Sequence, residues 1–391
     1  MPNLANDLKC TGCMACVSAC KNNAIKKQLK EDGHFYVAVD KTKCIECGAC
    51  EKICNASLDE YGINDISKSI VLGAYAKDSN VRGNATSGGV FAAIAFEIIK
   101  QGGAVIGAHF DGYNCSHICI HDCSEISDLQ GSKYVSSDLE GIHLTVENEL
   151  KRHDVLFSGV GCQCASVLAY IREKKYTHNL YTIDLVCGGY PSRILLDKYL
   201  EENTGVERIL SFRNKERYEL HVLKNGIDVI DDTKNLLLNG FSCALTSRWS
   251  CYNCQFAKAH RNTNLTIGDL WDTSIMNQEH EKGVSTVIVH DQKGFDLLNM
   301  AEIEFQEIPW KNVLISNNRI VEGKQLVFFP RKKLIKFKDS LTYDRFLKLY
   351  CIAMTRKDIR YSAFRAHRYI FNTIQKMKTK RMIRKMLAKG N

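Results

Sequence analysis

The chain has 391 residues and 18 cysteines, and it carries a formal net charge of +9 at pH 7. This length predicts two or three domains. The cysteines are too many for an ordinary cytosolic protein, and the chain is too long for a small secreted disulfide scaffold, so the composition favours metal ligation. Residues 331–391 hold 19 Lys and Arg against 3 Asp and Glu, which confines the excess positive charge to the C-terminal end and argues against a nucleic-acid-binding body.

Neither export nor membrane insertion is expected from the sequence. Residues Met1 to Lys9 lack the basic and apolar segments of a signal peptide. The longest apolar run, Val90 to Ile99, contains Glu97 and is too short to span a bilayer. We therefore expect a cytoplasmic protein.

Composition divides the chain into three regions, which we call the head (residues 1–60), the body (70–330) and the tail (331–391). The head is dense in cysteine and contains the only internal repeat of the sequence. Four cysteines follow the spacing C-x2-C-x2-C-x3-C and four more repeat it: Cys10, Cys13, Cys16 and Cys20, then Cys44, Cys47, Cys50 and Cys54.

This doubled spacing is typical of a bacterial dicluster ferredoxin domain. Three thiolates hold one 4Fe-4S cluster and the fourth ligates the other cluster. The first head set is therefore Cys10, Cys13, Cys16 and Cys54, and the second head set is Cys20, Cys44, Cys47 and Cys50. The proline usual after each fourth cysteine is replaced by Lys21 and Asn55, which removes no ligand. Zinc bound by two C-x2-C pairs would leave four well-placed thiolates unexplained.

In the body, short apolar runs alternate with longer helical patterns. The patterns predict, in chain order, a helix over 90–100, strands over 104–108 and 154–158, a helix over 165–174, a strand over 180–186 and a helix over 191–202. Such alternation is the signature of βαβ units and a mainly parallel sheet. The predicted fold is a ferredoxin domain followed by an α/β domain.

Four stretches of the body together resemble the beta subunit of coenzyme F-420 hydrogenases and dehydrogenases, a family that also includes hydroxymethyl-chlorophyll reductases. They are Thr86-Ser-Gly-Gly-Val-Phe, Gly131-Ser-Lys-Tyr-Val-Ser-Ser, Ser158-Gly-Val-Gly-Cys-Gln, and Cys251-Tyr-Asn-Cys with Ile267-Gly-Asp269. The resemblance extends over nearly the whole chain to about Pro330. Members of this family bind FAD, so the resemblance implies an FAD-binding body.

The resemblance implies flavin contacts from these stretches: Thr86, Ser87, Gly88, Gly89, Ser132, Lys133, Tyr134, Ser137 and Asp269. Two glycines before a helix would let the backbone approach a pyrophosphate at the positive end of the helix dipole, and Lys133 could add a positive charge. Taken alone, a Ser-Gly-Gly before a helix is more often a cap and a tight turn. Asp269 is expected to be a flavin-site or structural carboxylate rather than a general base.

Four further cysteines form what we call the body set: Cys162, Cys187, Cys251 and Cys254. Cys162 and Cys187 each follow a predicted strand, so parallel strands would bring both to the carboxyl edge of the sheet. Family members carry a 4Fe-4S cluster at the matching positions, which implies a third cluster here. Gly161 and Gly188 depart from the family, where proline and histidine are usual. The alternative is that Cys162 and Cys187 are core residues and the late pair binds nothing.

The remaining cysteines are expected to be inert. Cys115, Cys119 and Cys123 alternate with His117 and His121, which invites a metal interpretation, but the segment coincides with a predicted strand whose period would put them on one face. The others expected to be inert are Cys164, Cys243 and Cys351.

The tail pattern from Tyr361 to Leu387 is compatible with a cationic amphipathic helix, which would lie on anionic membranes or acidic partners. An alternative is a solvated end whose apolar residues pack on the body. Shorter bacterial relatives of the family, with an ending similar to residues Arg319 to Phe329, are often associated with surface-polysaccharide pathways. The resemblance thus suggests a glycan-precursor substrate and a site of action peripheral to the inner face of the membrane.

The leading functional hypothesis is an oxidoreductase. Electrons from a ferredoxin or another redox partner would enter through the head, cross the third cluster and reach FAD, which reduces or oxidises a small molecule by hydride transfer. No catalytic acid or base can be named from the sequence. A competing hypothesis is an electron-transfer subunit that docks to a separate catalytic partner, and a third is a binding protein with structural clusters.

Overall fold

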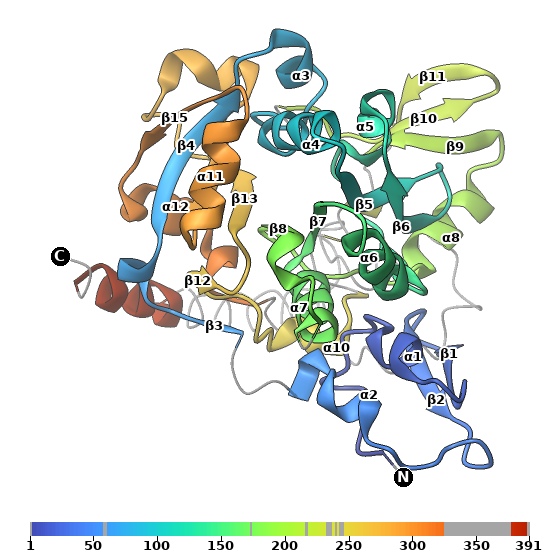
Figure 1. Cartoon of the computed structure of the whole chain (residues 1–391). Helices are drawn as coiled ribbons and strands as arrows, with labels where there is room; N and C mark the ends of the chain where they lie inside the picture. Colours follow the sequence, from blue (N-terminus) through green and yellow to red (C-terminus); the bar gives the residue numbers. More distant parts are fainter. Residues whose placement is uncertain are drawn as a thin grey trace.

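The computed structural model describes residues 2–57, 61–172, 174–215, 218–231, 237–238, 241, 246–323 and 377–388, and the fold is given for these. The head and an α/β body lie side by side, with the head against α7 and α10 (Figure 1). The elements of the head are α1 (Ala15–Ala19), β1 (Ile25–Leu29), β2 (Phe35–Val39), α2 (Ala49–Lys52) and the 3-10 helix η1 (Asn55–Ser57).

A mixed eight-stranded sheet is the centre of the body, in the order β15-β4-β14-β13-β8-β7-β5-β6. The four neighbours β13, β8, β7 and β5 are parallel, and the pairs toward both edges are antiparallel. The strand bounds are β4 (Ile70–Ala76), β5 (Ala104–Phe110), β6 (Cys115–Ile120), β7 (Val155–Val160), β8 (Leu180–Leu185), β13 (Leu265–Asp269), β14 (Ser285–Val289) and β15 (Ile303–Glu307).

Helices cover both faces of this sheet, and the alternation of side chains along the strands separates two cores. Leu156 of β7 packs with the helices of one face, and its neighbours Val155 and Phe157 pack with those of the other. The first face is covered by α4 (Val90–Lys100), α5 (Ile126–Leu129) and α11 (Gln292–Met300). The second is covered by α6 (Ile142–Leu150), α7 (Gly161–Ile171) and α12 (Trp310–Ser316).

Smaller elements complete the body. A three-stranded sheet is formed by β9 (Val206–Ser211), β10 (His221–Lys224) and β11 (Ile227–Ile230), and it packs with α8 (Ile194–Glu202). A short pair joins β3 (Gly62–Ile63) to β12 (His260–Arg261), and α3 (Ser79–Gly83) and α10 (Trp249–Tyr252) are single turns. The remaining 3-10 turns are η2 (Ile66–Lys68), η3 (Cys123–Glu125), η4 (Thr177–Asn179), η5 (Asn277–Lys282) and η6 (Asn318–Ile320).

The six body elements that the sequence predicted lie close to observed helices and strands. The helix over 90–100 coincides with α4, and the predicted strands and the helix over 191–202 shift by at most three residues. The helix predicted over 165–174 begins four residues earlier, because Gln163 at its third position accepts a hydrogen bond from Val160 N at 2.9 Å and closes the first turn. The expected α/β body with a parallel centre is therefore confirmed, although its sheet is mixed at the edges.

The end of the tail packs on the body. Residues 377–388 are helical, and Ile383 and Met386 are buried in the core beside α12 and Val71. This contact agrees with the alternative in which apolar tail residues pack on the body. The rest of the predicted amphipathic helix, together with residues 324–376, lies outside the described residues. Among the described helices, none is long and apolar enough to cross a membrane.

Several polar contacts join the head to the body. Arg248 of the body is 2 % exposed and donates to the carbonyl oxygens of Cys10, at 3.2 Å, and Phe35, and its guanidinium lies 4.4 Å from the centre of the Tyr36 ring. Asn55 Nδ2 donates to Cys162 O at 2.6 Å, and Gln255 Nε2 donates to Asn55 O at 2.8 Å. Lys27 forms an ion pair with Asp138 at 2.5 Å, and His34 Nε2 lies 2.8 Å from Thr246 O. The head is therefore held at the end of the sheet where Cys162 lies.

Candidate functional site

The first head set comes together as the spacing predicts. Burial raises the pKa of the Cys13 thiol to about 11, and the negative charges of Cys10 and Cys54 add to this rise. The pKa of Cys16 is raised by burial and then by Cys13, Cys10 and Cys54. These mutual effects require that the four sulfurs lie close together. Cys54, which belongs to the second repeat, thus faces the three cysteines of the first.

The second head set lies in the same domain. The pKa of Cys50 is raised first by burial, and Glu51, Cys20 and Cys47 contribute to the rise. Cys20 therefore joins the cysteines of the second repeat, as the interlocked arrangement requires.

The two repeats also share their backbone shape. Gly12 and Glu46, which precede the second cysteine of each repeat, have φ angles of 69° and 55°, and Met14 and Gly48, which follow it, have 60° and 72°. Left-handed residues at alternate positions turn successive backbone N–H groups toward one side, which forms a concave, anion-binding surface. Such a surface suits a cluster whose sulfurs carry negative charge.

The body set is drawn from three separate places in the fold. Cys162 is the second residue of α7, directly after β7, Cys187 follows β8, and Cys251 and Cys254 lie in and just after α10. Burial raises the pKa of Cys162 well above its usual value, and the charges of Cys254, Cys187 and Cys251 raise it further. The structure therefore brings together the four cysteines that the sequence assigned to one site.

Backbone N–H groups surround this body set. Gly189 N donates to Cys187 Sγ, and Tyr190 N donates to Cys251 Sγ, each at 3.3 Å. Hydrogen bonds of this kind stabilise thiolate and tune the potential of an iron-sulfur cluster.

The three cysteine sets lie near one another. Cys13 of the first head set is among the charges that raise the pKa of Cys162, and Cys50 of the second head set acts likewise on Cys16. Asn55 lies at the junction, where it accepts a hydrogen bond from Thr11 and donates to Cys162 O. The first head set therefore lies near both the second head set and the body set.

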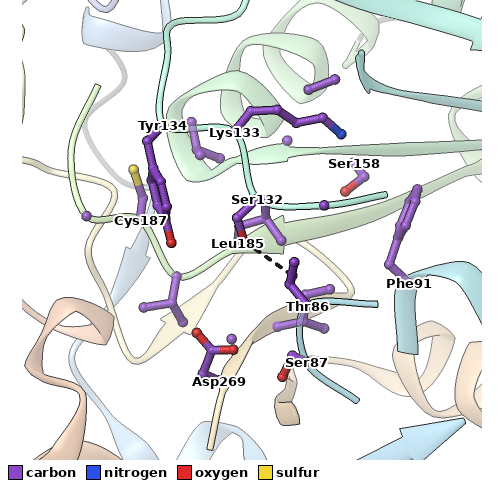
Figure 2. A pocket seen from close by; sticks show the side chains of 18 of the residues that line it. Thr86, Ser87, Phe91, Ser132, Lys133, Tyr134, Ser158, Leu185, Cys187 and Asp269 are labelled. Carbon is purple, nitrogen blue, oxygen red and sulfur yellow. Dashed lines mark hydrogen bonds between the residues drawn. The ribbon is translucent and has the colours of Figure 1, made fainter. Parts of the chain in front are cut away.

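A cavity of about 370 Å³ adjoins the body set, and Cys187 lines it. It opens at the carboxyl ends of the parallel strands, where Gly159, Leu185 and Asp269 stand near the ends of β7, β8 and β13. This edge is the usual ligand site of an open α/β sheet. Figure 2 shows Cys187 beside Tyr134, and Thr86 pointing toward Ser132.

Eight of the nine predicted flavin contacts line this cavity: Thr86, Ser87, Gly89, Ser132, Lys133, Tyr134, Ser137 and Asp269. Gly88 does not line it. Its N–H donates to Ser285 Oγ at 3.0 Å, and a Cβ at this position would lie 2.5 Å from Ala74 O. Gly88 therefore serves the close packing of this loop against β4 and β14.

Lys133 does not aim its charge into the cavity. Its Nζ donates to the carbonyl oxygens of Leu129 and Gln130 at 2.8 and 2.7 Å, and Figure 2 shows the side chain extending away from Thr86 and Asp269. Burial lowers the pKa of Lys133 to about 8. The expectation that Lys133 faces a phosphate is thus not met by this side-chain arrangement.

Two arginines that the sequence did not single out line the cavity. Arg213 pairs with Asp269 at 2.7 Å and donates to Thr86 O at 3.2 Å. Burial opposes the charge of Arg213, but the Asp269 carboxylate outweighs this and raises its pKa. Arg319 lies close enough to Cys187 for the two charges to interact. Neither arginine falls in a recognisable motif, so sequence patterns offered no signal.

Aromatic rings form one wall of the cavity. The Tyr134 ring lies 4.5 Å from that of Phe241 and 5.5 Å from that of Tyr218, measured between ring centres. Trp271 and Tyr218 are 43 % and 49 % exposed at the cavity lining. The wall offers flat apolar surface of the kind that ring-shaped ligands use.

The other cysteines that the structure describes lie outside these sets. Cys164 is fully buried and its Sγ lies 3.7 Å from the carbonyl oxygens of Gly159 and Ile183. Cys115 and Cys119 lie on β6 as predicted, whereas Cys123 begins η3 beyond the strand. Cys243 and Cys351 fall outside the described residues.

Comparisons with known proteins agree with this geometry. Residues 152–309 match the family model for the C terminus of the coenzyme F420 hydrogenase/dehydrogenase beta subunit, and residues 9–57 match the 4Fe-4S dicluster domain. The chain carries both of these domains. The resemblance predicted from the sequence is thereby confirmed for residues 152–309 and for the ferredoxin domain. The first of the two domains contains all four cysteines of the body set and Asp269, whereas the stretches around Thr86 and Ser132 precede it.

Several solved structures are similar to the chain, and one of them matches most of it. It is a chain of the F420-reducing [NiFe] hydrogenase complex from Methanosarcina barkeri, studied by xenon derivatization. The two share 15% sequence identity, with 74% of this chain and 91% of that chain covered, at a TM-score of 0.45. Among curated proteins, none matches the chain.

Proposed function

We propose that the protein is an iron-sulfur flavoprotein oxidoreductase. In this proposal the two head sets and the body set each hold a 4Fe-4S cluster, and FAD occupies the cavity beside Cys187. Iron-sulfur clusters pass single electrons, and FAD supplies the change from one-electron to two-electron chemistry. The observation that carries the proposal is that the first head set lies near both of the other sets and that Cys187 of the body set lines the cavity.

Several features of the cavity support FAD as its ligand. Val90, Phe91 and Ala92 begin α4 and line the cavity, and no side chain caps this helix, so its first N–H groups are available to a diphosphate. Gln130 also lines the cavity, and its buried Nε2 has no hydrogen-bond partner within the described residues. A buried amide donor without a partner is costly unless a ligand accepts from it.

The chain's own residues would shape the reaction around the cavity. The Arg213–Asp269 pair fixes one wall, and the rings of Tyr134 and Phe241 exclude water from another. The redox partner in this proposal is a ferredoxin or similar carrier that docks at the head. The substrate is a small molecule, and a glycan precursor and a place near the membrane rest on the resemblance alone.

Anaerobic purification followed by measurement of flavin, iron and acid-labile sulfide per chain tests this proposal. FAD with about twelve irons is expected from three four-iron clusters. About eight irons without flavin would overturn the assignment of the body. Gln130→Met should weaken FAD binding about tenfold, because about 1–1.5 kcal/mol is lost with one hydrogen bond. Gln101→Met, at the exposed end of α4, is the matched control.

A second candidate is an electron-transfer subunit whose catalytic partner is a separate protein. The exposed Trp271 and Tyr218 at the cavity favour it, since aromatic side chains are enriched at protein interfaces. The two candidates differ in a simple assay. If the isolated protein, reduced by ferredoxin, passes electrons to a hydride acceptor only after a partner protein is added, the subunit function is supported.

A further inference from the structure

A group of metal-binding side chains outside the redox sites lies where the edge strand β6 meets α6. Cys119 and His121, two residues apart at the end of β6, project to the same side as Glu149 of α6. The ligand atoms of these three residues all lie within 4.8 Å of one another. His153, four residues after Glu149, lies outside this group of three, but its Nε2 contacts Glu149 Oε2.

The distances are those of a coordination sphere around a small cation. Cys119 Sγ lies 3.9 Å from His121 Nε2, and the Nε2 atoms of His121 and His153 each lie 3.0 Å from Glu149 Oε2. Ligand atoms around a tetrahedral zinc ion are separated by roughly 3.3–3.6 Å, given bond lengths of about 2.0–2.3 Å. Cys119, His121 and Glu149 therefore lie near ligand distances already, and His153 would join them by rotation of its side chain.

The orientation of His153 supports ligation through Nε2. Its Nδ1 lies 3.3 Å from Asp154 O, so this nitrogen donates to the carbonyl. Metal-bound histidines commonly donate their other ring N–H to such an acceptor, which leaves the Nε2 lone pair for the metal. In a neutral His153 that lone pair would face the Glu149 carboxylate, and a cation between them removes the repulsion.

The charge balance also favours a divalent cation. A Cys119 thiolate and the Glu149 carboxylate carry two negative charges, which two neutral imidazoles and one Zn²⁺ would balance. Glu149 is 13 % exposed and contacts both histidines through a single oxygen.

We propose that Cys119, His121, Glu149 and His153 bind one zinc ion, which fastens the edge strand β6 to the end of α6. Binding releases the thiol proton of Cys119 to solvent and involves no redox step. Mixed sulfur, nitrogen and oxygen ligands suit zinc among the common divalent ions. The site is separate from the neighbouring cysteines of the same run. Cys115 is buried near Ser137 and Lys133, and Cys123 contacts Phe96 O.

Zinc content and coordination of the full-length protein, with its iron-sulfur clusters assembled under anaerobic conditions, test the proposal. After incubation with zinc and dialysis, we expect one zinc per chain in addition to iron. His121→Ala and Cys119→Ser should lose this zinc. Cys123→Ser and the exposed His178→Ala are matched controls that should retain it.

His121→Ala is the main variant because its side chain is 56 % exposed, and its melting temperature without zinc should equal that of the wild type. Zinc should raise the melting temperature of the wild type and leave that of His121→Ala unchanged. X-ray absorption should show one sulfur at about 2.3 Å and nitrogen or oxygen at about 2.0–2.1 Å. Four sulfurs, which would mean zinc in an iron-sulfur site, or equal zinc in wild type and both site variants, would overturn the proposal.

Discussion

The head and the body hold their cysteines in opposite ways. All eight head cysteines fall within residues 10–54, and local turns with left-handed residues at alternate positions point them inward. The body set runs from Cys162 to Cys254 and meets only because β7, β8 and α10 lie together at one end of the sheet. A cluster site in the head is therefore specified by spacing, whereas the body site depends on the whole α/β fold.

We expect the largest effect on iron content and electron transfer when a cysteine of the body set is replaced. Cys162→Ser should lower the iron content from about twelve to about eight per chain, because the head sets are complete without it. Reduced ferredoxin should then reduce the head but no longer the flavin. Cys164→Ala, two residues further along α7, removes a cysteine outside the sets and is the control. If Cys162→Ser keeps all its iron, Cys162 is a core residue and the alternative from the sequence holds.

The dependence of the body site on the fold can be tested at the buried ion pair of Arg261 and Asp184. The two side chains are 2 % and 0 % exposed and meet at 3.0 Å, and Arg261 also interacts with the charge of Cys254. Arg261→Met should lower the free energy of unfolding by about 3–5 kcal/mol, since it leaves a buried carboxylate unpaired. Chemical denaturation of the anaerobic protein measures this change.

Iron release during the same denaturation separates the two regions. In Arg261→Met the body iron should be lost at lower denaturant concentration, while the head iron is released as in the wild type. The double variant Arg261→Met with Asp184→Asn removes both charges and should recover part of the loss. Equal earlier release from both regions would contradict the distinction between local and fold-dependent sites.

Lys133 provides a pH-dependent comparison within the body. Its folded pKa of about 8 lies below its ordinary value of 10.5 because the ammonium group is buried. Between these values the unfolded chain binds a proton that the folded chain does not, so the contribution of Lys133 to stability rises with pH through this window. The rise amounts to about 3 kcal/mol. Below pH 8 the buried ammonium charge of Lys133 lowers the stability of the folded protein.

Melting curves from pH 7 to pH 10 check this expectation. Lys133→Met should lack the rise, so its advantage over the wild type should be greatest near pH 7 and should vanish near pH 10. Lys151→Met, at the exposed end of α6, should follow the wild type throughout. A constant difference between Lys133→Met and wild type across this range would show that Lys133 is not buried as a charge.

Features that depend on local spacing could be predicted from the sequence, whereas features that depend on the whole fold could not. The interlocked head sets required only spacing, and the helix over 90–100 required only periodicity. The pocket role of Thr86, Ser132 and Tyr134 came from the resemblance, because nothing local distinguishes such loops from ordinary turns. Arg213 could not be found, since its place beside Asp269 results from folding that joins residues 56 positions apart.

Cys119 and His121 show a second limit of the sequence, which can suggest the types of metal ligand but not their partners. The sequence showed cysteines and histidines alternating along one strand, and the strand period explained them without a metal. Only the packing of α6 against β6 adds Glu149 and His153 to two of them and leaves the others apart. Local pattern therefore suggested the ligand types, while the partners depended on contacts distant in sequence.

Arg248 connects the two regions, and its replacement should change stability less than the loss of the Arg261 or Lys133 charge does. Arg248→Met removes the charged donor from Cys10 O and Phe35 O, at a cost of about 2 kcal/mol, while every cysteine ligand stays in place. Iron content should therefore equal that of the wild type. Because the head would dock less tightly beside Cys162, electron transfer from the head to the body should slow, as rapid mixing with reduced ferredoxin would measure. Arg193→Met, at the surface of α8, is the control. Unchanged transfer with full iron would mean that the other contacts between head and body, among them those of His34, Asn55 and Lys27, hold the head in position beside the body set without Arg248.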